Sequence, residues 1–385
     1  MLLIVSLVCL HLQLCHSLEP YYKVLSKKDL DFTPQDPDPI AADDIDLSDV
    51  AISPKSYDKL VYFSKICALT YCIKDGTLVE NKTFLDGGCP HEIEFCSDLD
   101  VNPTAQRTRV ELVLVAEKDE LGTGYVAVDH GREVVMLAFR GSSTQQDWFS
   151  DFQIHPTTYV PASAKKYRKL VRDGVIPPCE GCKVHRGFYR FAKTLSRDFL
   201  ERVERIFNLY PNYNLVVTGH SLGAALASLC GIELVLRGFN PLVLTYATPK
   251  MFNQPLRDWV NDIFNTEQIH EKSIEKQELQ LNQGYFRVVH LQDYIPMVPP
   301  LYFVAGLEIF IEKLDFPHEI EDLEYRGMGN GMSWNSDDAL GDGGGIEDQG
   351  EIESVRSRLN ERVEKWLHMY EHRSYFIMIN TCSGF

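Results

Sequence analysis

Positive charge is scarce in this sequence of 385 residues. Lys and Arg total 38 against 55 Asp and Glu, which gives a formal net charge of −17, and no basic run exceeds two or three residues. Nucleic-acid binding depends on clustered Lys and Arg that neutralise phosphates, so the composition argues against such a partner. The same deficit removes electrostatic attraction to anionic membranes, and any contact with lipid therefore has to be apolar.

Long hydrophobic runs are missing except at the N-terminus. The run from Leu2 to Leu14 is shorter than the roughly 20 residues of a membrane span and ends in small residues, as the apolar core of a signal peptide does. We expect residues 1–17 to be cleaved after Ser17, and the mature chain to be extracellular or in the secretory pathway, without a transmembrane segment. The absence of Lys and Arg before the run leaves a membrane anchor as the alternative. The one sequon, at Asn81, predicts glycosylation there.

Heptads and internal repeats are absent too, and 44% of the residues are hydrophobic, which predicts one enzyme-sized domain over residues 51–385. We expect this domain to be a monomer. Residues 18–50 are acidic and contain prolines, which indicates a propeptide or an extended arm. Residues 319–353 form an acidic, Gly-rich insertion. Its carboxylates suggest calcium, but EF-hand spacing is missing, and a mobile surface loop is the favoured interpretation.

Cysteines number ten, of which Cys9 and Cys15 leave with the signal peptide. Cys179 and Cys182 form a C-E-G-C motif that fits a redox pair, half of a zinc site with His185, or a short disulfide. An oxidising compartment favours the disulfide, and no second ligand pair at zinc-site spacing is evident. We expect no metal and no cofactor.

The chain alternates between strand-like and helix-like segments. Alternation of this kind predicts an α/β fold with a mostly parallel central sheet covered by helices on both faces. The helical segments include residues 187–210 and the run after residue 221. The predicted strands are 110–117, 124–130, 133–139, the segment ending at His220, 241–249 and 285–293.

The segment LVVTGHSLGAAL, residues 215–226, places Ser221 between two glycines where a strand turns into a helix. A plain tight turn explains the glycines. A nucleophile elbow, in which the serine is held out on a strained turn at the edge of a sheet, explains the serine as well. Because chance can supply such a pentapeptide, the remaining sequence has to decide between them.

A serine nucleophile needs a base and an orienting carboxylate, which in the elbow arrangement follow in the order Ser, Asp or Glu, His. Asp293 ends the strand at 285–293, at the sheet edge where parallel sheets place their sites. His318, His368 and His372 are the candidate bases. His372 is favoured because it lies where the terminal helix meets the segment SYFIMIN.

The negative oxygen of a tetrahedral intermediate needs hydrogen-bond donors fixed in advance. The Leu222 N–H, which follows the serine, is one candidate, and Ser142 in FRGSS is the second. The segment continues with apolar and polar residues interleaved, a pattern that fits ordinary core packing or a lid with one apolar face. The apolar residues of this candidate lid are Trp148, Phe149, Phe152 and Ile154.

Five blocks in order resemble the fungal class 3 lipase family, a branch of the α/β-hydrolases: FRGSS, CKVHRGF, YPNYNLVVTGHSLGAALASL, YFRVVHLQDYIPMVPP and EHRSYFIMINTC. The resemblance covers the chain from about residue 110 to its end. It implies an α/β-hydrolase fold, a triad of Ser221, His372 and Asp293, an oxyanion hole at Ser142 and Leu222, and a lid over residues 144–154.

The resemblance also implies three disulfides, Cys72–Cys382, Cys89–Cys96 and Cys179–Cys182, which leave Cys67 and Cys230 unpaired. Two positions depart from the family pattern. Ala224 replaces a third glycine of the elbow, and Val304 replaces a histidine before the Ala-Gly pair. The long acidic insertion before His372 is a further departure.

The family implies a secreted triacylglycerol lipase that acts at a lipid–water interface. Feruloyl esterases share the GHSLGA and C-x-x-C-x-V-H blocks, so a soluble-ester carboxylesterase with the same triad is the main alternative. The apolar lid residues favour the lipase. A hydrolase fold without activity, used for binding, is the third reading, and a complete triad argues against it.

Overall fold

The fold is seen in a computed structural model, in which the described residues belong to one unit spanning 46–343 and 357–385. The residues that the structure describes are 47–115, 122–141, 156–194, 197–299, 302–329, 370–379 and 382.

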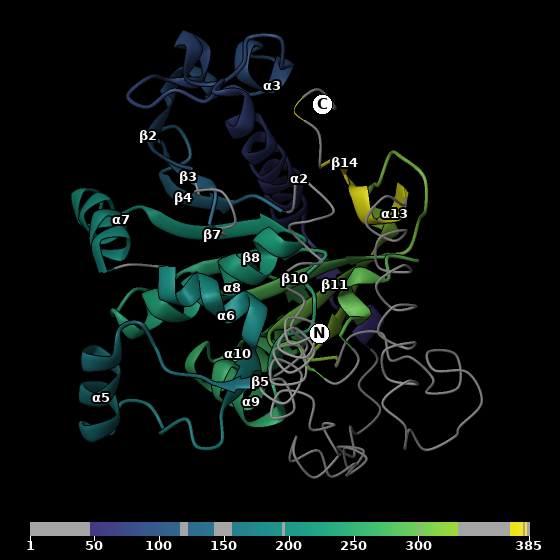
Figure 1. The fold of residues 1–385 in the computed structure, drawn as a ribbon. Coiled ribbons are helices and arrows are strands. Elements are labelled where there is room, and N and C mark those ends of the chain that lie inside the picture. The colour runs from purple at the N-terminus through teal and green to yellow at the C-terminus, as the bar shows by residue number, and fades with distance from the viewer. Residues whose placement is uncertain are drawn as a thin grey trace, which may run out of the picture. The chain divides into compact units, whose positions relative to one another are not determined.

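One large sheet organises the described part of the chain (Figure 1). Its strand order is β12-β11-β10-β8-β7-β4-β3-β2. The five strands from β11 to β4 run parallel, while β2, β3 and β12 pair antiparallel at the two edges. The bounds are β2 Thr108–Leu114, β3 Gly124–Asp129, β4 Val134–Phe139, β7 Asn214–His220, β8 Leu242–Tyr246, β10 Gly284–His290, β11 Leu307–Ile311 and β12 Leu323–Gly327.

Alternation along the strands divides the apolar side chains between two cores. Tyr125 and Ala127 of β3 face the core that contains α2, Pro54–Leu69, whereas Val126 and Val128 face the core that contains α8. The inner strands β3, β4, β8, β10 and β11 are buried along their whole length, as expected for a sheet covered by helices on each side. Figure 1 shows α6 and α8 in front of the sheet.

The remaining helices flank this sheet or close its loops. The longer ones are α5 Ala164–Arg172, α6 Arg186–Thr194, α7 Arg197–Leu209, α8 Leu222–Leu236, α9 Gln254–Ile263 and α10 Thr266–Lys276. The short ones are α3 Glu94–Ser97 and α13 Tyr370–Arg373, with 3-10 turns η2 Leu47–Asp49, η3 Thr70–Asp75, η5 Ala105–Arg107, η6 Ile295–Met297 and η7 Ile320–Asp322, and a π-turn, η4 Phe84–Gly88.

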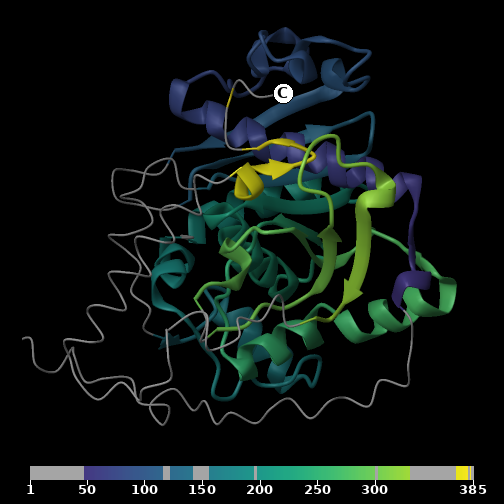
Figure 2. The same ribbon diagram turned by 90° about the vertical axis from the view of Figure 1, so that its right-hand side faces the viewer.

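Three small strand pairs complete the described elements. They are β1 Ala51–Ile52 with β9 Glu278–Leu279, β5 Pro156–Thr158 with β6 Lys183–His185, and β13 Ser374–Tyr375 with β14 Ile377–Met378. The β13–β14 hairpin follows α13 and lies alongside α2, as the yellow and purple ribbons of Figure 2 show.

The predicted strands and the elbow helix are present, with ends shifted by a few residues. The expected helix at 187–210 is two helices, α6 and α7. The prediction of a mobile loop from residue 319 is wrong for the first part of that segment. Residues 320–327 form η7 and β12, because Tyr325 packs into the core and β12 pairs with β11 at the sheet edge. The rest of the insertion, from residue 330, lies outside the described residues.

Candidate active site

The turn from β7 into α8 holds Ser221 in an unusual backbone conformation, with φ 59° and ψ −126°. Positive φ is strained for a residue with a side chain, and here the flanking glycines permit the turn. A Cβ on Gly219 would lie 2.2 Å from the carbonyl oxygen of Gly223, and one on Gly223 would lie 2.2 Å from that of Phe139. At the elbow, the end of β7, the first turn of α8 and the end of β4 therefore lie in direct backbone contact, with no room for a side chain at Gly219 or Gly223.

Ser221, His372 and Asp293 form a hydrogen-bonded chain. The Oγ of Ser221 lies 3.0 Å from His372 Nε2, and His372 Nδ1 lies 3.1 Å from both carboxylate oxygens of Asp293. All three residues are buried, with exposed fractions of 3%, 2% and 1% in that order. The three lie 72 or more residues apart in sequence and meet at the edge where β7 and β10 end.

The Asp293 carboxylate is held from three directions. Its Oδ1 accepts the Ile295 N–H at 2.9 Å, and its Oδ2 accepts the Tyr375 hydroxyl at 2.5 Å. Burial by itself raises the pKa of Asp293, but His372, together with these hydrogen bonds, lowers it below its usual value. The carboxylate is therefore ionised beside the imidazole that it contacts.

His220, directly before the serine, braces the backbone of His372. Its Nε2 lies 2.8 Å from the His372 carbonyl oxygen, and its Nδ1 lies 3.1 Å from the Tyr71 hydroxyl. Burial, followed by the proximity of His372, lowers the pKa of His220 to about 3. His220 is thus a neutral donor at the site.

Of the three candidate bases, His372 occupies the position next to Ser221. His318 is buried at a separate place, against His290 and the backbone of Phe376. His368 lies outside the described residues, as do Ser142 and the candidate lid residues Trp148, Phe149, Phe152 and Ile154. Leu222 begins α8, where the first N–H groups have no acceptor within the helix.

The segment before Ser142 contacts the elbow. A Cβ on Gly141 would lie 3.4 Å from the Cβ of Ser221 and 2.3 Å from the Tyr71 hydroxyl oxygen. The end of β4 and its turn therefore lie directly beside Ser221, which leaves Gly141 as a position where a side chain does not fit.

A family model and a relative show the family to which this chain belongs. The model of the family "Lipase (class 3)" matches residues 136–303. A Saccharomyces cerevisiae protein named "Putative lipase LIH1" is 55% identical over 337 residues, which is 88% of this chain and 98% of that protein. The chain belongs to the class 3 lipase family.

Further relatives of this class 3 family member carry more specific names. The secreted mono- and diacylglycerol lipase A of Penicillium cyclopium is 31% identical over 179 residues, 46% of this chain and 47% of that one. The fold matches a solved triacylglycerol lipase whose catalytic centre is described as a serine protease triad. That match has a TM-score of 0.55 at 21% identity and covers 86% of this chain and 99% of the other. The expected α/β-hydrolase fold is confirmed.

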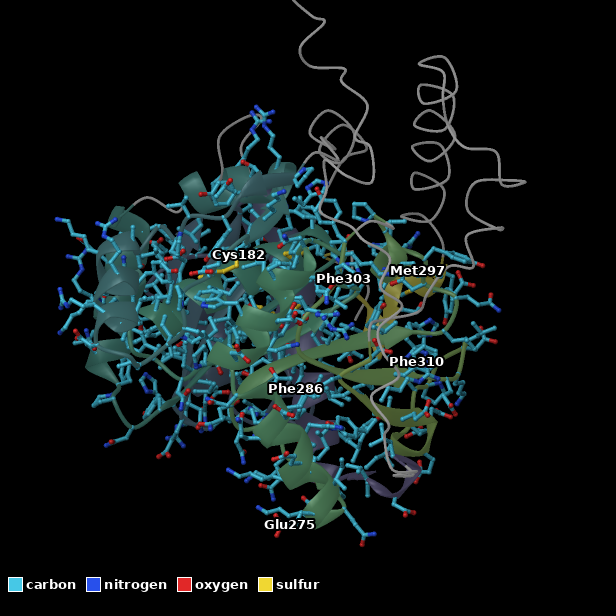
Figure 3. All side chains as sticks on the ribbon, turned by 90° about the horizontal axis from the view of Figure 1, so that it is seen from below. Cys182, Glu275, Phe286, Met297, Phe303 and Phe310 are labelled. Atoms are coloured by element: carbon cyan, nitrogen blue, oxygen red, sulfur yellow. A yellow bond between two sulfur atoms is a disulfide. The ribbon has the colours of Figure 1, made fainter. Side chains whose placement is uncertain are left out.

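The cysteines of this family member pair as the resemblance implies. The structure contains the disulfides Cys72–Cys382, Cys89–Cys96 and Cys179–Cys182, the last of them visible at the label Cys182 in Figure 3. Cys67 and Cys230 are buried thiols.

Within the part of the chain that the structure describes, no group of three or more His, Cys, Asp or Glu side chains could hold a metal ion, and no helix is long and apolar enough to cross a membrane. Asn81 is exposed, and its side-chain oxygen accepts from Arg109 at 3.0 Å.

Proposed function

We propose that this protein is a secreted triacylglycerol lipase in which Ser221, His372 and Asp293 act as nucleophile, base and orienting carboxylate. The observation that carries the proposal is the continuous hydrogen-bonded chain from Ser221 Oγ through His372 to Asp293, buried at the elbow of an α/β-hydrolase fold. A plain tight turn needs the glycines but has no need of the other two residues.

The reaction follows from this geometry. Ser221 Oγ attacks the ester carbonyl while His372 Nε2 takes its proton, and Asp293 stabilises the imidazolium and fixes its tautomer. Collapse of the tetrahedral intermediate releases the alcohol, which receives the proton from His372. Water then enters, gives a proton to His372 and attacks the carbonyl of the acyl-serine. As this second tetrahedral intermediate collapses, His372 returns the proton to Ser221 Oγ, which frees the fatty acid and restores the serine.

The Leu222 N–H and Ser142 are proposed as donors to the oxyanion. The position of Leu222 at the first turn of α8 supports the former, and the contact of Gly141 with Ser221 supports the latter, since Ser142 is the next residue. Losing one such donor typically costs about 3 kcal/mol of transition-state stabilisation.

The substrate rests on the family and on the lid sequence. The relatives are named as lipases, one of them a secreted lipase of mono- and diacylglycerols, so glyceride esters are the proposed class. The apolar lid residues over 144–154 favour a triglyceride at a lipid–water interface. The same proposal includes residues 1–17 as a signal peptide and residues 18–50 as an arm or propeptide. It also includes glycosylation at Asn81, which the exposure of that residue supports.

The alternative is an esterase for soluble esters with the same triad. The two are separated by measuring hydrolysis of tributyrin through its solubility limit. A lipase with a lid should accelerate as emulsion forms. Smooth saturation there, together with good turnover of methyl ferulate, would favour the soluble esterase.

A fluorophosphonate probe tests the chemistry independently of the substrate. The wild-type protein should be labelled at Ser221, and Ser221→Ala should not be labelled. If the wild-type protein is not labelled at all, the inactive binding protein becomes the better reading.

A further inference from the structure

Two buried histidines outside the catalytic chain, His290 and His318, lie between the loop of Asp293 and the hairpin that follows His372. His290 ends β10, and the Asp293 N–H donates to its carbonyl oxygen at 3.0 Å. His318 belongs to the loop after β11 and is 2% exposed. The Nε2 atoms of the two imidazoles are 3.3 Å apart.

The second nitrogen of His318 reaches the hairpin. Its Nδ1 accepts the backbone N–H of Phe376 at 3.2 Å. Phe376 is the turn residue between β13 and β14 and has φ 66°, a left-handed conformation that costs a residue with a side chain about 1–2 kcal/mol. Such a conformation persists only where its surroundings hold it. His318 supplies one of those restraints, because it accepts the N–H of Phe376, which lies two residues past the start of β13.

His318 is itself fixed on several sides. The Tyr57 hydroxyl of α2 donates to its carbonyl oxygen at 2.7 Å, and the rings of Phe316 and Phe376 lie 4.9 and 6.0 Å from its own ring. Figure 2 shows the loop after β11 passing over the yellow hairpin. The imidazole is therefore a rigid bridge rather than a loose surface side chain.

The hydrogen bonds assign the protons of this bridge. Because the Phe376 N–H donates to Nδ1, the neutral His318 carries its proton on Nε2, which donates to His290 Nε2. A proton added to His318 removes the acceptor of Phe376, and a proton added to His290 removes the acceptor of His318. The bridge is intact only when both rings are neutral.

We propose that His318 is a positioning residue for the reaction: through Phe376 and His290 it holds the segment bearing His372 in register with the loop bearing Asp293. This inference rests on the proposed function of that pair. His318 does not contact Ser221, but under this proposal it keeps His372, which does, in alignment. A displacement of about 1 Å in such an alignment can cost roughly 100-fold in rate.

The test contrasts two amides at position 318. His318→Asn places a side-chain oxygen where Nδ1 stands and can still accept from Phe376, whereas His318→Gln reaches toward His290 and leaves the Phe376 N–H without its acceptor. A half-exposed histidine in the turn between β3 and β4, changed as His130→Gln, is the matched control.

Each variant is titrated with a fluorophosphonate, and kcat and KM per labelled site are measured on a soluble p-nitrophenyl ester. We expect kcat of His318→Gln, which breaks the link to Phe376, to fall roughly 10- to 100-fold with KM unchanged. His318→Asn, which breaks only the link to His290, should lower kcat less, and His130→Gln should stay close to wild type. A purely structural role lowers the thermal midpoint and leaves kcat per site alone. Folded His318→Gln with the kcat of His318→Asn would overturn the inference.

If His318→Gln does not fold, the contrast moves to position 290. His290→Gln keeps an acceptor near Nε2 for His318, and His290→Asn does not reach it. Equal kcat values in these two variants overturn the inference, and a lower kcat in His290→Asn supports it. A wild-type protein that neither reacts with the probe nor hydrolyses the ester instead refutes the proposed function, so the two failures are distinguishable.

Discussion

The hydroxyl of Tyr375 donates to the Asp293 carboxylate at 2.5 Å, and the same hydroxyl oxygen accepts the backbone N–H of His290 at 3.2 Å. Tyr375 lies three residues after His372, on the first strand of the terminal hairpin. One buried hydroxyl thus joins the chain end that carries the base to the loop that carries the carboxylate. Burial, and then the charge on Asp293, raises the pKa of this phenol well above its usual range, so it stays a donor.

Tyr375→Phe should therefore lower kcat with little change in KM. It removes a hydrogen bond to a charged group, which is worth about 1.5–3 kcal/mol, and leaves the buried His290 N–H without its acceptor. We expect kcat to fall roughly 10- to 100-fold. Steady-state kinetics on a soluble ester, corrected for labelled sites, measures it. A tenfold higher KM at unchanged kcat would contradict this account.

The identity of the base is tested by two histidine substitutions. His372→Ala should lose several orders of magnitude in turnover, because loss of the base alone costs about as much as loss of the whole triad. His368→Ala is the control, because His368 is the other candidate base on the same terminal segment of the sequence. If His368→Ala loses activity to that extent and His372→Ala does not, the base has been assigned to the wrong residue.

The elbow allows no side chain at its second glycine. Gly223→Ala places a Cβ 2.2 Å from the Phe139 carbonyl oxygen, a backbone atom that cannot move aside cheaply. We expect a loss of about 3 kcal/mol or more in the free energy of unfolding, measured by urea denaturation. Ala224→Gly, at the neighbouring helix position, should cost only about 1 kcal/mol. Similar losses in the two variants would show that the contact at Gly223 does not govern the stability.

Periodicity and order predict most of this fold from sequence, because each signal is local. The β-branched strands, the elbow and the placement of Asp293 at a strand end all follow from neighbouring residues. The choice of His372 over His318 also comes from sequence context, and the structure brings His372 alone of these two to Ser221. The strand pair β11 and β12 and the helices α9 and α10 are not among the elements predicted from sequence.

The contacts that orient the site are not local and leave little trace in sequence. His318 lies in the segment FPHEI, which offers no motif, and its partners His290 and Phe376 are 28 and 58 residues away. The charge-rich segment of β12 predicts a loop, although Tyr325 is buried at its centre. Only their contacts in the folded protein distinguish such residues from solvent-exposed ones.

The disulfide Cys72–Cys382 ties the end of the chain to the turn after α2, across 310 residues of sequence. Removing a native disulfide typically costs about 2–5 kcal/mol, and here it also releases the segment ten residues past His372. We expect the double variant Cys72→Ser, Cys382→Ser to lower both the thermal midpoint and kcat per labelled site. The double variant Cys89→Ser, Cys96→Ser, which opens a bridge within a short loop, should lower only the midpoint. Equal kcat values in the two double variants would show that the disulfide Cys72–Cys382 has no specific part in aligning His372.

Acid should destabilise the protein through its buried histidines. Burial and then His290 lower the pKa of His318 to about 4, and burial lowers that of His290, even though nearby carboxylates act in the opposite direction. Asp293 and Glu371 face His290; Asp322 and the cation of Lys313 face His318. The phenols of Tyr57 and Tyr375 that contact this pair remain neutral donors in acid.

The sign follows from proton uptake. Between about pH 6.5, where an unfolded histidine titrates, and the folded value of about 4 for His318, the unfolded chain binds the extra proton. Stability should therefore fall as the pH is lowered through this window, by about 1.4 kcal/mol per pH unit for each proton taken up. Urea denaturation of wild type and His318→Asn at several pH values isolates this residue, because every other group titrates in both. We expect a shallower decline in His318→Asn, and parallel curves would mean that His318 is protonated as readily in the folded protein as in the unfolded chain.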